Sequence, residues 1–187
     1  MTFKVVFIFA QSFLLMELIF AQTMVSGDIA SNTTWTLTNS PYTLTGDISI
    51  YNGAKLTIES GVTINCQNNS ITVGSYTSGA GILQANGVNY NNGYITFQTS
   101  SSGVIDGCKF VNSELRFKDQ SNPQVINNIF DTNTKLRFNS ESAFPRISGN
   151  DYGSKKLYIN FDVSKNLTIK NIPNVDYYLE GGFSVIS

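Results

Sequence analysis

A regular repeat in the second half of the chain limits what this sequence can fold into. Four triplets of apolar, polar and apolar residues follow one another at nearly constant steps: Ile95–Phe97, Leu115–Phe117, Leu136–Phe138 and Leu157–Ile159. Alternation over three residues is the pattern of a short β-strand that turns two side chains to one side. A fixed period of this length is typical of a solenoid, in which each coil is stabilised by its neighbours.

Each repeat also contains a second apolar position, a bend and a third apolar position. The second position holds Ile105, Ile126, Ile147 and Ile169, and the third holds Phe110, Phe130 and Tyr152. Two residues after each member of the first set stand Gly107, Asn128, Gly149 and Asn171. Glycine and asparagine adopt the left-handed backbone conformation at the lowest cost, so we expect the bend there. Three short strands per repeat predict an all-β fold, a single right-handed parallel β-helix (solenoid) with about 21 residues per coil.

The first half of the chain carries the same kind of triplet at less regular spacing. The triplets are Ile48–Ile50, Leu56–Ile58, Val62–Ile64 and Ile71–Val73. We therefore assign residues 48–187 to β-helix coils, and residues 22–47, with Trp35 and Tyr42, to an N-terminal cap and first strand. No comparable cap is evident before Ser187, so either the last segment folds back or the chain is truncated at its C-terminus. An open last coil would expose strand edges and allow end-to-end self-association.

Residues 1–21 have the organisation of a secretory signal peptide. Lys4 precedes an apolar run over residues 5–20, and Ala21 supplies a small residue at the cleavage position. The run is shorter than the ~20 residues that cross a bilayer, and it contains Glu17. We expect cleavage before Gln22, a secreted protein at the cell surface or outside the cell, and no membrane span in the mature chain.

Two segments of the first half resemble a known family. The run Gly53–Ile64 and the run Gly81–Gly87, which leads into Tyr94–Phe97, resemble the opening coils of secreted bacterial right-handed parallel β-helix proteins. These proteins belong to the pectate-lyase-like (pectin lyase-like) superfamily in the broad sense, and the resemblance extends over residues 33–172. It implies the fold. It implies less about activity, because that superfamily contains lyases, hydrolases, esterases and adhesins.

The composition excludes several functional classes. The chain has no histidine, so it lacks Ser-His-Asp and Cys-His nucleophile systems and histidine-ligated metal sites. It has 12 Lys+Arg against 13 Asp+Glu. Nucleic acid is therefore not an expected partner, because its binding depends on basic residues that neutralise phosphates. We expect no cofactor and no metal.

The spacing between the two cysteines, Cys66 and Cys108, is twice the repeat. If they occupy the same position of the repeat, two coils separate them by roughly 9–10 Å at the usual strand spacing. That distance exceeds the ~7 Å between Cα atoms that a disulfide allows. We expect two buried thiols and no disulfide.

The outward positions beside the first strand of each repeat would stack into one surface feature. It consists of Tyr94, Arg116, Lys135, Arg137, Lys156 and Tyr158, and we call it the basic strip. We expect the strip to bind an anionic polysaccharide or cell-surface glycan, with cations on carboxylates or sulfates and tyrosines against sugar rings. A bound anion would relieve the repulsion between Arg116 and Arg137. The alternative is that the charges keep an exposed sheet soluble, with Glu114 pairing Lys135.

No constellation of catalytic residues is evident, and we assign none. The position after the second strand holds Asp106, Asn127 and Ser148, a single carboxylate. Asp106 could meet Glu114 or Asp119 to supply the two facing carboxylates of a glycosidase, but no motif requires it. The main expectation is a non-catalytic secreted module with a structural, adhesive or carbohydrate-binding role. The alternative is a polysaccharide lyase or other carbohydrate-active enzyme, by analogy with the superfamily.

Adsorption to ice or another ordered surface is a third class of function. It is suggested by outward threonines in the nearly uncharged first half, Thr57, Thr63, Thr72 and Thr96. Each strand nevertheless shows one such threonine and not a pair. The high β propensity of threonine accounts for their presence without a function.

Overall fold

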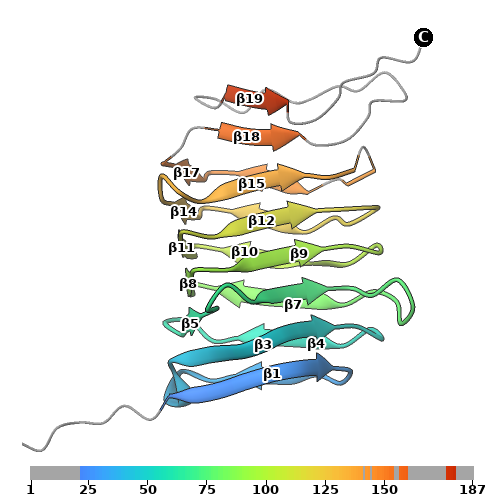
Figure 1. Cartoon of the computed structure of the whole chain (residues 1–187), viewed down its shortest axis with the longest axis vertical. Helices are drawn as coiled ribbons and strands as arrows, with labels where there is room; N and C mark the ends of the chain where they lie inside the picture. The colour runs from blue at the N-terminus through green and yellow to red at the C-terminus, as the bar shows by residue number, and fades with distance from the viewer. Residues whose placement is uncertain (1–21, 141, 144, 154–155, 160–175, 180–187) are drawn as a thin grey trace, which may run out of the picture.

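The structure is a computed structural model that describes residues 22–140, 142–143, 145–153, 156–159 and 176–179. It is a parallel β-solenoid of about six turns, with successive coils about 21 residues apart, which confirms the predicted fold class (Figure 1). Within the described residues the only helical element is the short 3-10 helix η1 (Leu37–Asn39), and none of their helices has the length and hydropathy to cross a membrane. The predicted signal peptide (1–21), the bend at Asn171 and the end of the chain (180–187) lie outside the described residues.

Three parallel ladders of strands run along the stack. The first ladder contains β1 (Thr23–Ile29), β3 (Tyr42–Ile50), β6 (Ser70–Val73), β9 (Tyr94–Phe97), β12 (Glu114–Phe117), β15 (Lys135–Phe138), β18 (Lys156–Ile159) and β19 (Asp176–Leu179). The second contains β2 (Thr33–Trp35), β4 (Lys55–Ile58), β7 (Ile82–Asn86), β10 (Ser102–Asp106), β13 (Gln124–Ile126) and β16 (Arg146–Ser148). The third contains β5 (Thr63–Asn65), β8 (Asn89–Asn91), β11 (Lys109–Val111), β14 (Ile129–Phe130) and β17 (Asp151–Tyr152). It joins the first ladder through the long strand β3.

The register stacks like residues on like in the first ladder. Leu115 pairs with Ile95 on one side and Leu136 on the other, and Phe117 pairs with Phe97. Leu115 and Phe117 are fully buried. Burial of each such side chain contributes roughly 1.5–3 kcal/mol, and it is available only because the neighbouring coils cover the face.

A column of aromatic rings fills the inside of the third ladder. It contains Tyr90, Phe110, Phe130 and Tyr152, with centroid separations of 4.8, 5.1 and 5.5 Å along the column. Parallel strands about 4.8 Å apart bring equivalent rings to stacking distance. The strand spacing therefore sets the geometry of this part of the core.

Residues 22–47, which we expected to form a cap and first strand, are built as the first coil of the solenoid. β1 pairs with β3 in parallel, and β2 pairs with β4. Trp35 and Tyr42 are buried with ring centroids 4.8 Å apart. The Tyr42 hydroxyl accepts a hydrogen bond from the N–H of Thr36 at 2.8 Å, so its polar end is also satisfied. The two rings fill the inside of this coil.

One predicted bend residue is wrong by one position. The left-handed residues of this column are Gly87, Gly107, Asn127 and Gly149, and they do not include Asn128. The register explains the difference: Asp106 pairs with Ile126, so the counterpart of Ile105 is Val125. The bend therefore comes two residues after Val125, at Asn127.

Asn128 lies inside the turn, in a ladder of hydrogen bonds with Cys108 and Asn150. Its Oδ1 accepts from the N–H of Cys108 at 2.9 Å, and its Nδ2 donates at 3.0 Å to the carbonyl of Ile105 and to Oδ1 of Asn150. One coil further, Asn150 accepts from the N–H of Asn128 and donates to the carbonyl of Val125, both at 2.8 Å. The side-chain amides thus supply partners for buried backbone groups at the bend.

Cys66 and Cys108 are free thiols, and both are buried. They do not share a position of the repeat. Cys108 aligns with Val88 just before the third ladder, whereas Cys66 follows β5 and lies so close to Gly93 that a Cβ on this glycine would come within 2.2 Å of the Cys66 Cβ. Burial raises the pKa of Cys66 to about 12 and that of Cys108 to about 11, so both stay protonated near neutral pH.

Candidate functional site

The outward side chains of the first ladder form two columns that carry the basic strip. One column contains Tyr94, Glu114, Lys135 and Lys156. The other contains Thr96, Arg116, Arg137 and Tyr158. The structure therefore brings all six predicted residues of the strip onto adjacent strands of one face, β9, β12, β15 and β18, which lie one above the other in Figure 1.

Glu114 joins the two arginines of the strip. Its Oε1 accepts hydrogen bonds from Nε of Arg116 at 2.7 Å and from Nε of Arg137 at 2.8 Å. The side chains of Arg137 and Glu114 are only 15% and 13% exposed. A carboxylate of the chain itself thus relieves the repulsion between the arginines. A bound anion is therefore not required to relieve it, and the alternative pairing of Glu114 with Lys135 is replaced by pairing with the two arginines.

The Glu114 carboxyl is held in its ionised form. Burial alone would raise its pKa, but hydrogen bonds from Arg116 and Arg137 and the charges of these guanidinium groups outweigh burial and lower the pKa. At neutral pH the three side chains carry a net charge of one positive unit.

Cations of the strip lie over tyrosine rings. The guanidinium carbon of Arg116 is 4.4 Å from the ring centroid of Tyr94. Lys135 Nζ and the guanidinium carbon of Arg137 lie 5.1 and 5.4 Å from the centroid of Tyr158. Such contacts are worth about 0.5–1 kcal/mol at exposed sites, and they hold long side chains in one conformation.

The strip extends to Tyr178 of β19, which sequence reasoning missed. Lys156 Nζ is 4.4 Å from its ring centroid, and the rings of Tyr158 and Tyr178 are 5.9 Å apart. Tyr178 stands one repeat after Tyr158 in the sequence, so the period was the signal that could have found it.

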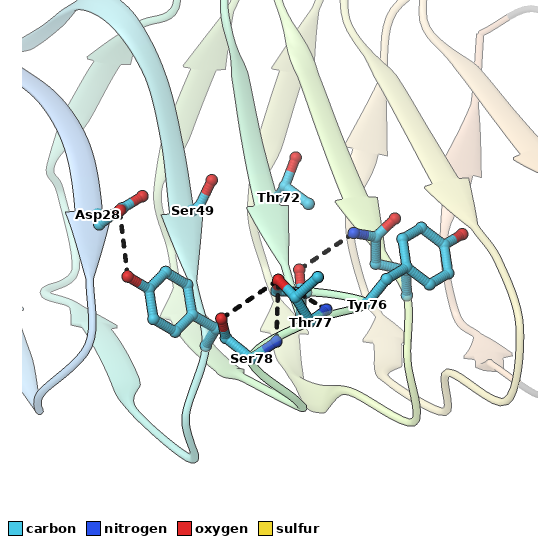
Figure 2. Close-up of a pocket in the computed structure, with 10 residues that line it drawn as sticks. Asp28, Ser49, Thr72, Tyr76, Thr77 and Ser78 are labelled. Atoms are coloured by element: carbon cyan, nitrogen blue, oxygen red, sulfur yellow. Dashed lines mark hydrogen bonds between the residues drawn. The ribbon is translucent and has the colours of Figure 1, made fainter.

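A second feature of this face, not expected from the sequence, is a cleft near its N-terminal end. It has a volume of about 400 Å³. Figure 2 shows Asp28, Ser49 and Thr72, from β1, β3 and β6, along one side of the cleft, and loop residues that include Tyr76 and Ser78 along the other. The cleft thus lies between the outward side chains of the first ladder and a projecting loop.

The loop over residues 74–80 lengthens its coil. Ile71 and its partner Ile95 are accordingly further apart in the sequence than Ile95 and its partner Leu115. Gly74 begins the loop with a φ of 100°, and a Cβ there would lie 2.3 Å from the carbonyl oxygen of Gln98. Ser75 and Gly79 exchange two backbone hydrogen bonds of 2.8 Å. These bonds give the loop a defined shape beside the sheet.

Two tyrosines of the cleft have a carboxylate near their hydroxyls. Tyr51 donates a hydrogen bond to Asp28 at 3.1 Å, which fixes its ring. The pKa of Tyr51 is raised, chiefly by this hydrogen bond, and that of Tyr76 is raised by desolvation and then by the nearby carboxylate of Asp119, in the turn after β12. Figure 2 shows Tyr76 at one end of the cleft and Asp28, the partner of Tyr51, at the other. Tyr76 remains 68% exposed, so its ring is open to a ligand.

The carboxylates considered for catalysis lie in three different places. Asp106 is on β10 in the second ladder, where it accepts a hydrogen bond from Asn127 at 2.9 Å. Glu114 is on β12 in the first ladder, where it pairs with Arg116 and Arg137. Asp119 accepts a hydrogen bond from the N–H of Thr99 at 3.2 Å. Among the residues placed by the structure, no group of three or more Cys, Asp or Glu side chains could hold a metal ion.

The outward threonines do not share one face. Thr72 and Thr96 pair in the first ladder, whereas Thr57 lies in the second and Thr63 in the third. Adsorption to an ordered surface through a common rank of threonines therefore has no geometric basis here.

Comparison of the chain with protein-family models, with curated proteins and with solved structures gives no match. The functional argument accordingly rests on the first ladder, with its basic strip and its cleft.

Proposed function

We propose that this protein is a secreted, non-catalytic β-helix module that binds an anionic polysaccharide or cell-surface glycan through the basic strip. The observation that carries the proposal is the charge of the strip within a chain of net charge -1. From β9 to β19 the described outward columns hold four cations, Arg116, Lys135, Arg137 and Lys156, against two carboxylates, Glu114 and Asp176, whereas Asp28 and Asp47 lie nearer the N-terminal end of the same face. An excess of positive charge on one rigid face attracts a polyanion and aligns it with the stacked strands.

The lysines are the main groups that a ligand would contact. Arg137 is largely enclosed with Glu114, whereas Lys135 lies over the ring of Tyr158 and Lys156 over that of Tyr178. A carboxylate or sulfate can pair with an ammonium group while the sugar ring packs beside the neighbouring tyrosine. The alternation of cation and ring along the strip suits a chain of charged sugars.

Binding of polygalacturonate and dextran sulfate to the purified protein, with neutral dextran as reference, tests the proposal. Lys135→Ala/Lys156→Ala should weaken binding of both polyanions about tenfold and reduce its salt dependence. Lys55→Ala/Lys109→Ala is the matched control, because these exposed lysines lie on β4 and β11, away from the first ladder. Equal losses in the two double variants would mean that only net charge matters and would refute the strip as a site.

Glu114→Gln gives a test of opposite sign. It removes the carboxylate that neutralises two arginines, so it should strengthen polyanion binding. Unchanged or weaker binding, in a variant shown to be folded, would contradict the proposal. Growth of ultraviolet absorbance from unsaturated uronides would establish the alternative function, a polysaccharide lyase.

Export and membership of the pectate-lyase-like superfamily belong to the same proposal. They are supported by the signal-peptide organisation of residues 1–21 and by the resemblance carried by Gly53–Ile64. N-terminal sequencing of protein collected from the culture medium should begin at Gln22. A product retained in the cells with Met1 in place would contradict export.

A further inference from the structure

We propose that the cleft beside the loop at residues 74–80 binds an uncharged sugar unit, so that the first ladder recognises a glycan with neutral units next to anionic ones. This inference rests on the proposed function, because it specifies the ligand of the same face. It is carried by the chemistry of the lining, by the two tyrosines of the cleft and by the register that joins the cleft to the basic strip.

The lining favours a neutral, hydroxyl-bearing ligand. It contains no cation, and its only charged residue is Asp28, so an anionic group would be repelled. One oxygen of Asp28 accepts from Tyr51, which leaves Oδ1 to accept a ligand hydroxyl. Ser49 and Thr72 are half-buried, and their hydroxyls make no hydrogen bond within the described part of the chain. Each can donate one bond to a ligand and accept another.

The tyrosines supply apolar surfaces between these polar groups. A flat aromatic ring packs against the C–H face of a sugar ring while the sugar hydroxyls reach the side chains around it. Tyr51 is already held by its hydrogen bond to Asp28, so it loses less conformational freedom on binding, and the exposed ring of Tyr76 offers the larger free surface. A volume of about 400 Å³ is within the range of small-molecule sites.

One column of outward positions runs through both the cleft and the strip. In register, Asp28 is followed by Ser49, Thr72, Thr96 and Arg116. Two strand spacings, roughly 9–10 Å, separate Thr72 from Arg116. Thr96, between them, is only 6% exposed, so an extended glycan along the stack would pass over this covered position, with one part in the cleft and the next at the cations.

Titration calorimetry of the purified protein with uncharged hexasaccharides of glucose, xylose and galactose tests the inference. Thr72→Val removes one hydroxyl of the cleft, with little change in shape, and should weaken the best-binding hexasaccharide about fivefold. Tyr76→Ala should weaken it at least about tenfold. Thr57→Val is the matched control, because it makes the same change at a half-buried outward position of the second ladder. Lys135→Ala/Lys156→Ala should leave binding of the neutral hexasaccharide unchanged.

The outcomes separate this inference from the proposed function. If polyanions bind through the strip but no neutral hexasaccharide binds, the cleft inference is overturned and the proposed function stands. Neutral binding that survives both Thr72→Val and Tyr76→Ala also overturns it, because the sugar then binds elsewhere. Preference for a hexamer of cationic glucosamine, lost in the same two variants, would overturn the uncharged ligand class. If neither polyanions nor neutral sugars bind, both proposals fail.

Discussion

Replacing Asn128 by alanine tests the amide ladder at the bend between β13 and β14. The Asn128 side chain is 1% exposed, and it is the partner of two backbone groups, the N–H of Cys108 at 2.9 Å and the carbonyl of Ile105 at 3.0 Å. Alanine removes both hydrogen bonds and one of the two bonds that Oδ1 of Asn150 accepts. The variant therefore leaves polar backbone groups without these partners inside the solenoid.

The expected loss follows from the number of groups affected. A buried polar group that loses its partner costs about 1–3 kcal/mol, so two backbone groups lower the free energy of unfolding by about 2–6 kcal/mol. The free energy of unfolding of a whole domain is only about 5–15 kcal/mol. Asn128→Ala should thus be among the more damaging single substitutions in this chain, although it changes neither the charge nor an aromatic column.

Urea unfolding followed by circular dichroism measures this loss as a lower midpoint at unchanged slope. Trp35 is the only tryptophan and lies four strands before β13 in the second ladder, so its fluorescence reports whether distant coils unfold together. Asn122→Ala, at an exposed loop position before β13, is the control and should change stability by less than about 0.5 kcal/mol. If Asn128→Ala costs no more than this control, the reasoning from the amide ladder is refuted.

Phe117→Ala should lower the free energy of unfolding by about 3–5 kcal/mol, since it empties a fully buried position between two other phenylalanines; an unchanged urea midpoint would count against the stacked core. Cys66 and Cys108, with pKa values of about 12 and 11, should react with a thiol reagent near pH 8 only after denaturant is added, and rapid labelling of the native protein would contradict their burial. Glu114→Gln should reduce stability at neutral pH by about 1–2 kcal/mol, after allowance for the partial exposure of its partners. The Glu114 pKa is lower in the folded than in the unfolded chain, so its contribution is complete above about 4.5 and is lost as the pH falls through the folded pKa; a difference between parent and variant that persists at about pH 2 would contradict this.

The fold could be predicted from the sequence because the length of one coil sets both the period of the sequence repeat and the pairing register of neighbouring strands. A side chain at one step of the period stacks on its counterpart one coil away, so the spacing of Ile95, Leu115 and Leu136 already implies their pairing. The misplaced bend arose where that relation is weakest. Val125 and Ile126 are both apolar, and only the parallel pairing with β10 shows which of them points inward.

The site was less predictable, because it depends on how long side chains bend and on where the repeat is interrupted. The period places Arg116 and Arg137 next to each other, but the Glu114 carboxylate can reach either these arginines or Lys135, and packing decides between them. The cleft needs the insertion after Gly74, which has no periodic pattern of its own. The lengthened step between the triplets that begin at Ile71 and Ile95 was the sequence signal for it.

In a solenoid each coil contacts only its neighbours, so the inward columns can stabilise the fold while the outward columns bind ligands. The inward columns hold the stacked rings and aliphatic side chains that stabilise the coils, and the outward columns of the first ladder hold the strip and the cleft. An insertion such as the loop at 74–80 can therefore build a cleft on one coil without interrupting the core, since Ile71 still pairs with Ile95 beneath it. It follows that Lys135→Ala/Lys156→Ala and Thr72→Val should alter ligand binding while leaving the urea midpoint nearly unchanged, whereas Phe117→Ala should do the reverse.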